Sequence, residues 1–405
     1  MIFRLMLTGA TLALVALAAR AEHPVFSLYT FSSPPYQYAS SRPGEPKVIG
    51  ETADTIRCAM AMADAEVDIR LMPQNRARYS MQRNMVDGYF AVDRSMELDQ
   101  IALRSHPVAL EKWYWFYVGE MAEPDSARIG VIGGSNEAEW LVRNGIDPYL
   151  EVASAEQLPA LLKRGRIDIA MMDHRVMESL LKSSPQLHDT LNEEFLRYAP
   201  LHLYLNRRFS TEHVGVLDEF NTSLPLCMKQ HLALTDRERE QVARTAIRLT
   251  DNLIQNVDLT TAIYSGPTTN NLTDVLTQDT LWQALAPHQP TPLAREILAL
   301  PASRALARWQ SEHDGLVTEV LLTNNTGALV AMSQLSSDYW QGDEPKYQEI
   351  ANPTEYGIER KSEMWISPIR YDASTSQFQV IVSVPVPANS PDNGLDGVLV
   401  LGLAI

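Results

Sequence analysis

The chain has 405 residues, of which 45% are hydrophobic, and its formal net charge is −16 at pH 7. A chain of this length and apolar content can build more than one globular domain. Its acidic balance excludes the basic footprint that nucleic-acid binding needs, and it disfavours adhesion to an anionic membrane surface.

Residues 1–21 have the pattern of a secretory signal peptide. Arg4 gives a short positive region, residues 5–18 are almost wholly apolar, and Ala19–Ala21 form a small-x-small cleavage pattern. The apolar run is shorter than the roughly 20 residues that span a bilayer. We expect a soluble periplasmic protein that begins at Glu22 and has no direct membrane anchor. Its charge is then −18, because Arg4 and Arg20 leave with the peptide.

The chain has two cysteines, Cys58 and Cys227. In an oxidising compartment they either form one disulfide or stay as separate buried thiols, and the sequence leaves both possibilities open. They lie far apart and no histidine cluster accompanies them, so the spacing of a metal site is missing. The sequence predicts neither a metal nor any other cofactor.

Residues 22–232 alternate between strand-like and helix-like segments. After Gly50, Ile56, Ala59, Met60 and Ala63 recur at helical spacing, and Ser154 with Gln157 has the pattern of a capping box. The alternation predicts an α/β domain with mostly parallel sheets. The strand candidates are Val25–Phe31, Val67–Met72, Tyr89–Val92, Trp113–Val118, Ala127–Ile132 and Ile167–Met172.

The pattern changes near residue 235, and residues 235–405 form a second predicted domain. Thr235 and Glu238 make a capping box before a long amphipathic helix at 236–256. Residues 265–295 are rich in Pro, Thr and Asn and predict a loop or short helices. An α+β domain with a mainly antiparallel sheet follows, and Asn324–Gly327 is its first hairpin turn. Its strand candidates are Val317–Leu322, Ala328–Ser333, Trp365–Ile369, Gln377–Pro385 and Gly397–Ile405.

Two features of the first domain are candidates for binding a polar ligand. The turn Gly130–Ser135 lies between a strand and a helix, where free N–H groups and the Ser135 hydroxyl favour an anion. Asp173 follows a strand at the edge where ligands of open α/β sheets bind, and it suits a cationic or hydroxyl group. The alternative for both Ser135 and Asp173 is ordinary helix capping.

Arginine and aromatic side chains supply further candidates. Arg76 and Arg94 have the planar fork that binds carboxylates, although a solvated arginine is the ordinary alternative. Tyr29 and Tyr36 flank the Pro34–Pro35 turn and predict either a pocket wall or core packing. Patterns of serine hydrolases, zinc proteases, P-loop enzymes and dinucleotide-binding enzymes are missing from the sequence, so we expect a protein that is not an enzyme.

The first domain resembles the amino-acid-type bacterial extracellular solute-binding proteins (family three). The matching segments, in order, are SSPPYQY, GETADTIRCAM, MPQNRARYSMQRNMVDGYFAV, RSHPV, IGVIGGSNEAEWL and LLKRGRIDIAMMDHRV. The resemblance implies two α/β lobes that close on a ligand, with hinge strands near Trp113–Val118 and Leu201–Leu205.

The same resemblance implies roles for individual residues. Ser135 and the amides after Gly134 match the family's carboxylate-binding turn, and Asp173 matches its ammonium-binding aspartate. Tyr29 and Tyr36 lie where aromatic side chains of the family cover the ligand. Glu97 occupies the place of the family's carboxylate-clamping arginine, so Arg94 or Arg76 would have to substitute for it.

The second domain resembles periplasmic Cache (PDC) sensor modules, which have a long N-terminal helix and a PAS-like antiparallel sheet. The matching segments are VTEVLLTNNTGALVAMSQLSSDYWQGDEPKYQEI, MWISPIRYDASTSQFQVIVSVPVP and GVLVLGLAI. Within the first of them, Asp338, Trp340 and Asp343 either contact a second ligand or pack structurally.

These resemblances together favour a soluble periplasmic sensor that binds a small polar solute and reports to a membrane-bound receptor. The alternative is the substrate-binding receptor of an ABC-type amino-acid importer, whose partner is a permease. An enzyme built on the same two-lobe fold and a structural protein with an inactive cleft are weaker alternatives.

Overall fold

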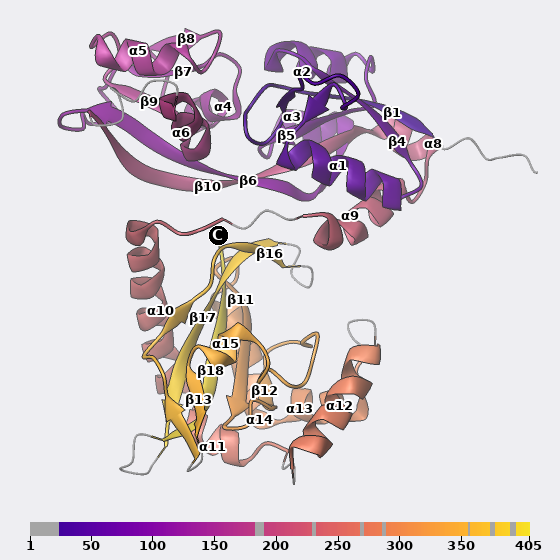
Figure 1. The fold of residues 1–405 in the computed structure, drawn as a ribbon, viewed down its shortest axis with the longest axis vertical. Coiled ribbons are helices and arrows are strands. Elements are labelled where there is room, and N and C mark those ends of the chain that lie inside the picture. Colours follow the sequence, from indigo (N-terminus) through magenta and orange to yellow (C-terminus); the bar gives the residue numbers. More distant parts are fainter. Residues whose placement is uncertain are drawn as a thin grey trace, which may run out of the picture.

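The computed structural model describes residues 24–182, 190–228, 232–267, 271–285, 289–354, 357–372, 377–388 and 394–405. The expected signal peptide at 1–21 lies outside these ranges. Over the described residues, every helix is too short or too polar to cross a membrane. Figure 1 shows an α/β unit, coloured indigo to magenta, next to a unit made of the long helix α10 and an orange-to-yellow sheet.

The first unit is built on one eight-stranded sheet in the order β4-β1-β5-β10-β6-β9-β7-β8. β1 pairs in parallel with β4 and β5, and β7 pairs in parallel with β8 and β9. We call the β1 side lobe 1 and the β7 side lobe 2. The strands are β1 (Val25–Thr30), β4 (Glu66–Leu71), β5 (Gly88–Val92), β6 (Ala102–Val118), β7 (Ile129–Ile132), β8 (Leu150–Val152), β9 (Ile169–Asp173) and β10 (Leu191–Asn206).

Two long strands, β6 and β10, join the lobes. They have 17 and 16 residues and pair antiparallel along nearly their whole length (Figure 1). Both are much longer than the hinge segments expected from the sequence, because polar residues in 102–112 and 191–198 interrupt the apolar pattern. The expectation of mostly parallel pairing is right within each lobe and wrong at the centre of the sheet.

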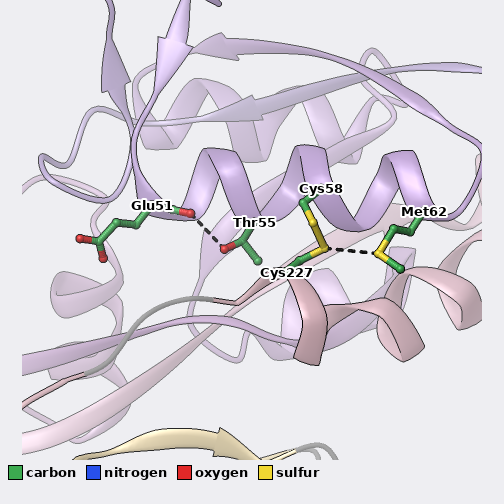
Figure 2. The surroundings of a disulfide bond; sticks show 5 residues. All are labelled: Glu51, Thr55, Cys58, Met62 and Cys227. Carbon is green, nitrogen blue, oxygen red and sulfur yellow. Dashed lines mark hydrogen bonds between the residues drawn. A yellow bond between two sulfur atoms is a disulfide. The ribbon is translucent and has the colours of Figure 1, made fainter.

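Helices cover the lobes, and the first of them is covalently linked to another helix. α1 buries Ile56, Ala59 and Met60, and Cys58 on α1 forms a disulfide with Cys227 on α9 (Figure 2). The disulfide excludes the alternative of separate thiols. The helices are α1 (Glu51–Met62), α2 (Gln74–Gln82), α3 (Met96–Ile101), α4 (Asn136–Arg143), α5 (Gln157–Lys163), α6 (His174–Lys182), α8 (Arg207–Glu212) and α9 (Val216–Cys227).

One predicted cap in this unit is wrong. Ser154 does not cap α5, whose N-cap is Glu156. The Gln157 side chain still reaches back, but it accepts a hydrogen bond from the Ala153 backbone N–H. The chain enters α5 through a tight turn in which the Gln157 N–H donates to the Ser154 carbonyl, so Ser154 contributes its backbone and not its hydroxyl.

The second unit contains α10 (Asp236–Asn256) and an antiparallel sheet in the order β12-β11-β18-β17-β15, with β16 also paired to β17. Thr235 and Glu238 form the predicted capping box. Residues 265–295 are more helical than expected, since α12 (Leu272–Leu285) buries Val275 and Trp282. The remaining elements are α11 (Leu259–Tyr264), α13 (Pro292–Ala299), α14 (Pro301–Glu312), β11 (Val317–Asn324), β12 (Leu329–Met332), α15 (Pro345–Gln348), β13 (Ala351–Thr354), β14 (Gly357–Arg360), β15 (Trp365–Ile366), β16 (Arg370–Asp372), β17 (Gln377–Pro387) and β18 (Leu395–Ala404).

Candidate ligand-binding cleft

A cavity of about 390 Å³ lies between the two lobes. We call it the inter-lobe cavity. Lobe 1 contributes Phe31–Pro34 and Leu71–Gln74, and lobe 2 contributes Ala153–Glu156 and residues at the ends of β7 and β9. The volume is within the range of about 300–1,000 Å³ that is typical of small-molecule sites, and so is its position between two lobes.

Asp173 lies at the end of β9 and lines this cavity. Its carboxylate accepts hydrogen bonds from the Tyr36 hydroxyl of lobe 1 (3.2 Å), the Lys112 N–H (2.8 Å) and the Val176 N–H (3.0 Å). Burial raises the pKa of Asp173, and these hydrogen bonds oppose the rise. Burial, followed by the nearby Asp173 charge, raises the pKa of Tyr36 well above its usual value. Asp173 therefore caps α6 and connects the lobes, and it also faces the cavity.

The predicted anion-binding turn is occupied by the protein's own groups. The buried Ser135 hydroxyl accepts from the Ala138 N–H (3.1 Å) and so caps α4. Gly134 has a positive φ of 69°, and a methyl group there would collide with the carboxamide of Asn75 from lobe 1. Gly133 lines the cavity, whereas Gly134 and Ser135 are not among its lining residues. The Ser135 hydroxyl therefore caps α4, and ligand binding by Ser135 stays a prediction.

The other predicted residues lie away from the cavity. Arg76 and Arg94 are exposed, and the Arg94 side chain is 3.9 Å from Asp99. Tyr29 is half-buried and packs on a lobe 1 cluster that includes Tyr89. None of these three candidates is among the residues that line the cavity. The preceding residue, Asp93, is buried at the end of β5, whereas the Arg94 side chain is exposed.

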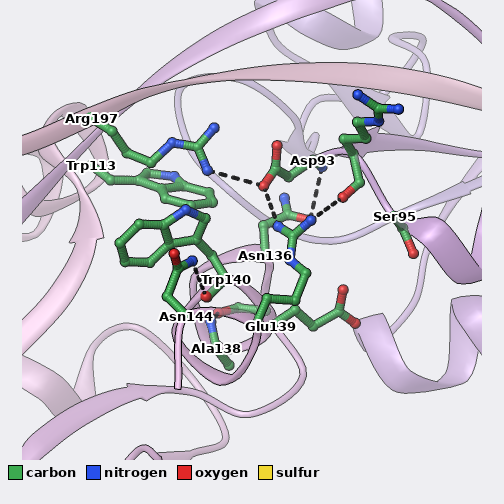
Figure 3. A network of polar contacts seen from close by, with 12 residues as sticks. Asp93, Ser95, Trp113, Asn136, Ala138, Glu139, Trp140, Asn144 and Arg197 are labelled. Atoms are coloured by element: carbon green, nitrogen blue, oxygen red, sulfur yellow. Dashed lines mark hydrogen bonds and ion pairs between the residues drawn. The ribbon is translucent and has the colours of Figure 1, made fainter. Parts of the chain in front are cut away.

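Asp93 is the centre of a polar network that joins the lobes (Figure 3). Its carboxylate contacts Arg143 of α4 (2.7 Å) and Arg197 of β10 (3.2 Å), and its N–H donates to Asn136 (3.1 Å). The Arg197 guanidinium lies over the Trp113 ring, 4.8 Å from its centroid, where a cation–π attraction is expected. This network fixes lobe 2 and the crossing strands to the end of β5.

Further ion pairs hold the lobes together around the cavity. Arg175 of α6 makes two contacts, of 2.6 and 2.8 Å, with Glu51 of α1. The buried Arg78 of α2 contacts Glu139 of α4 at 2.7 Å. Together with the Tyr36–Asp173 hydrogen bond, these contacts join the two lobes directly.

Two buried glutamates that the sequence reasoning missed also line the cavity. Glu111 of β6 is 3% exposed and accepts from the Trp113 indole N–H (2.9 Å). Burial, with the charges of Asp173 and Glu137, holds the pKa of Glu111 well above its usual value. Burial raises the pKa of Glu137 to about 7. The signal for Glu111 was present in VALEKWYWFYV, where a charged pair interrupts an otherwise apolar strand.

Lys112 connects this cavity with the second unit. Its N–H donates to Asp173, while its buried ammonium reaches Glu238 of α10 (2.8 Å) and the Ala233 carbonyl (2.6 Å). The Tyr114 hydroxyl donates to the other oxygen of Glu238 (3.0 Å). Leu110 belongs to the apolar core of the second unit, together with residues of α10 and its sheet. Lys112 of β6 thus links Asp173, which lines the cavity, to Glu238 in the first turn of α10.

The residues predicted as a second site make local contacts. The Trp340 indole N–H donates to the Thr326 carbonyl (2.8 Å), and Asp338 accepts from the Gln341 carboxamide (2.6 Å). Asp343 is exposed. These contacts suit a packed turn, and a ligand at Asp338, Trp340 and Asp343 stays a prediction. In the described part of the chain, no three or more His, Cys, Asp and Glu residues are grouped so that they could hold a metal ion.

No protein-family model matches the chain, and no curated protein matches it. Similar solved structures include an ancestral arginine-binding protein bound to arginine (15% identity, 49% of this chain and 90% of that chain, TM-score 0.41). Others are a histidine kinase sensor domain with similarity to periplasmic binding proteins (15%, 57% and 97%, 0.44) and an amino-acid ABC transporter substrate-binding protein from Streptococcus pneumoniae bound to L-arginine (13%, 51% and 93%, 0.41).

Likeness at these TM-scores carries no inference about ligand or activity. Independently of it, the topology of the first unit is consistent with the periplasmic-binding-protein fold expected from the sequence, because two α/β lobes are joined by two crossing strands.

Proposed function

We propose that the protein is a periplasmic sensor that binds a small polar solute in the inter-lobe cavity and reports the bound state to a membrane partner through α10. The observation that carries this proposal is the double contact of Lys112, whose backbone holds Asp173 and whose side chain holds Glu238. A movement of the lobes that shifts β6 has to shift the first turn of α10 as well.

The contact between the two units favours sensing over transport. A receptor for an importer needs a cleft that opens and closes on a hinge, but it does not need a buried ion pair between the hinge and a second unit. In the proposal, the second unit is a Cache-like sensor module, supported by α10 and the antiparallel sheet that follows it. Export to the periplasm is supported by the Cys58–Cys227 disulfide, since disulfides persist in oxidising compartments.

The proposal is tested by a thermal-shift panel of amino acids, amines, small carboxylates, sugars and nucleobases on the mature protein. A ligand at about 100 times its Kd adds about 2.7 kcal/mol of stability. A tryptophan in place of Ala155, which lines the cavity, fills the space between the lobes. Ala160→Trp, on an exposed position of α5, is the matched control.

We expect at least one compound to raise the Tm of the wild type and of Ala160→Trp, and to have no effect on Ala155→Trp. A compound that stabilises all three proteins equally binds elsewhere and contradicts the assignment of the cavity. A panel without any stabilising compound contradicts the proposed binding function.

A further inference from the structure

We infer that the inter-lobe cavity takes an organic cation that has no carboxylate, such as an aliphatic amine or a guanidinium. This rests on the proposed function, because it names the chemical class of ligand for the same cavity. The charges of the lining residues are the first support. Four carboxylates line the cavity, and the described lining residues include no lysine, arginine or histidine; the four are Glu111, Glu137, Glu156 and Asp173. Burial raises the pKa of Glu111, Glu137 and Asp173 because it disfavours their charged forms, and a bound cation would stabilise those charged forms.

Glu111 is the buried group that needs a partner. One carboxylate oxygen accepts from the Trp113 indole, while the structure gives the other oxygen no hydrogen bond within the described ranges. Burying a carboxylate costs free energy unless the charge is paired and hydrogen-bonded. An ammonium or guanidinium in the cavity would supply both the charge and the missing donor. The neighbouring Asp173 already has three donors, so Glu111 is the better anchor.

The groups that would recognise a ligand carboxylate are occupied or lie elsewhere. Ser135 caps α4, and Asn75 covers the backbone at Gly134. The buried Arg78 forms an ion pair with Glu139 but no hydrogen bond among the described residues, and neither residue lines the cavity. An α-amino acid in this cavity would bring its carboxylate against Glu111 and Glu137 without an opposing cation, and it would therefore bind less well than the matching amine.

The size and walls of the cavity favour an organic cation over a metal ion. A volume of about 390 Å³ exceeds what a single ion fills. Among the described residues, no cluster has the composition of a metal site. Much of the lining is apolar, which suits an alkyl chain between or beside charged groups; these residues include Phe31, Pro34, Leu71, Met72, Ile132 and Leu180.

Pairs of compounds that differ only by a carboxylate give the direct test. Titration calorimetry on the mature protein would compare agmatine with L-arginine, 1,4-diaminobutane with L-ornithine, and 1,5-diaminopentane with L-lysine. We expect the decarboxylated member of at least one pair to bind at least tenfold more tightly. Glu111→Gln removes the unpaired charge and should weaken that binding at least tenfold. Glu66→Gln, at an exposed position of β4, is the control and should leave it unchanged.

Far-UV circular dichroism would show whether Glu111→Gln folds, and Glu137→Gln serves as the second variant if it does not. An amino acid that binds as tightly as its amine, or tighter, overturns the inference, as does amine binding that survives both substitutions. A neutral or acidic solute that is lost on Ala155→Trp would overturn the inference and leave the proposed function standing. Failure of every compound class would overturn the proposed function itself.

Discussion

Replacing Lys112 by methionine tests the connection between the cavity and the second unit. The Lys112 and Glu238 side chains are 6% and 1% exposed, and their charged atoms lie 2.8 Å apart. Removing one partner of a buried ion pair leaves the other charge unpaired, which costs about 3–5 kcal/mol. Methionine keeps most of the volume of the lysine stem, so we expect the loss to come from the orphaned Glu238 carboxylate.

A second substitution shows whether the lost stability comes from the unpaired Glu238 charge or from the lost packing of the Lys112 side chain. Glu238→Gln keeps an oxygen that can accept from Thr235 in the capping box, because glutamine serves in that position as well as glutamate. The double variant Lys112→Met with Glu238→Gln should therefore recover most of the lost stability. Equilibrium urea unfolding of the four proteins gives the coupling free energy. A loss below about 1 kcal/mol in Lys112→Met, or no recovery in the double variant, would refute the reasoning.

Two further perturbations have effects whose direction follows from the structure. Replacing Cys58 and Cys227 by serine removes a link between positions 169 residues apart and should cost about 2–5 kcal/mol in urea unfolding; an unchanged midpoint would contradict it. The pKa of Glu137 is raised to about 7 from an ordinary value near 4.5, so its contribution to stability is complete below pH 4.5 and is lost as the pH rises through 7. The loss amounts to about 3 kcal/mol. Because glutamine does not titrate, the Tm of Glu137→Gln should rise relative to that of the wild type as the pH goes from 4.5 to 8. A difference in Tm that stays constant over that range would contradict the raised pKa of Glu137.

The sequence was informative where one periodic pattern decides the structure. Alternating segments predicted an α/β domain with parallel strands, and the resemblance to solute-binding proteins implied its two lobes. The position of Asp173 directly after an apolar strand predicted its place at the end of β9. The capping box at Thr235 also needs only neighbouring residues. The full length of β6 and β10 could not be predicted from the sequence. Polar residues such as Glu193 and Glu194 interrupt the apolar pattern, yet they lie in a strand that pairs along nearly its whole length.

The candidate site was less predictable because it depends on contacts between distant segments. Arg76 and Arg94 have side chains that suit a carboxylate, but both are exposed and neither lines the cavity. Asn75 covers Gly134 only because α2 and α4 meet across the lobes. The role of Glu111 follows from its burial beside Asp173, which the sequence separates by more than sixty residues.

Hydrogen exchange of the mature protein, with and without the panel compound that gives the largest rise in Tm, tests the central claim most directly. The account predicts increased protection at the cavity, in residues 171–176, and a change in the first turn of α10, residues 236–242. Lys112→Met should retain the change at the cavity and lose the change in α10. Protection that is confined to the cavity in the wild type would contradict a sensor that signals through α10, and exchange that is unaffected at the cavity would contradict the binding site.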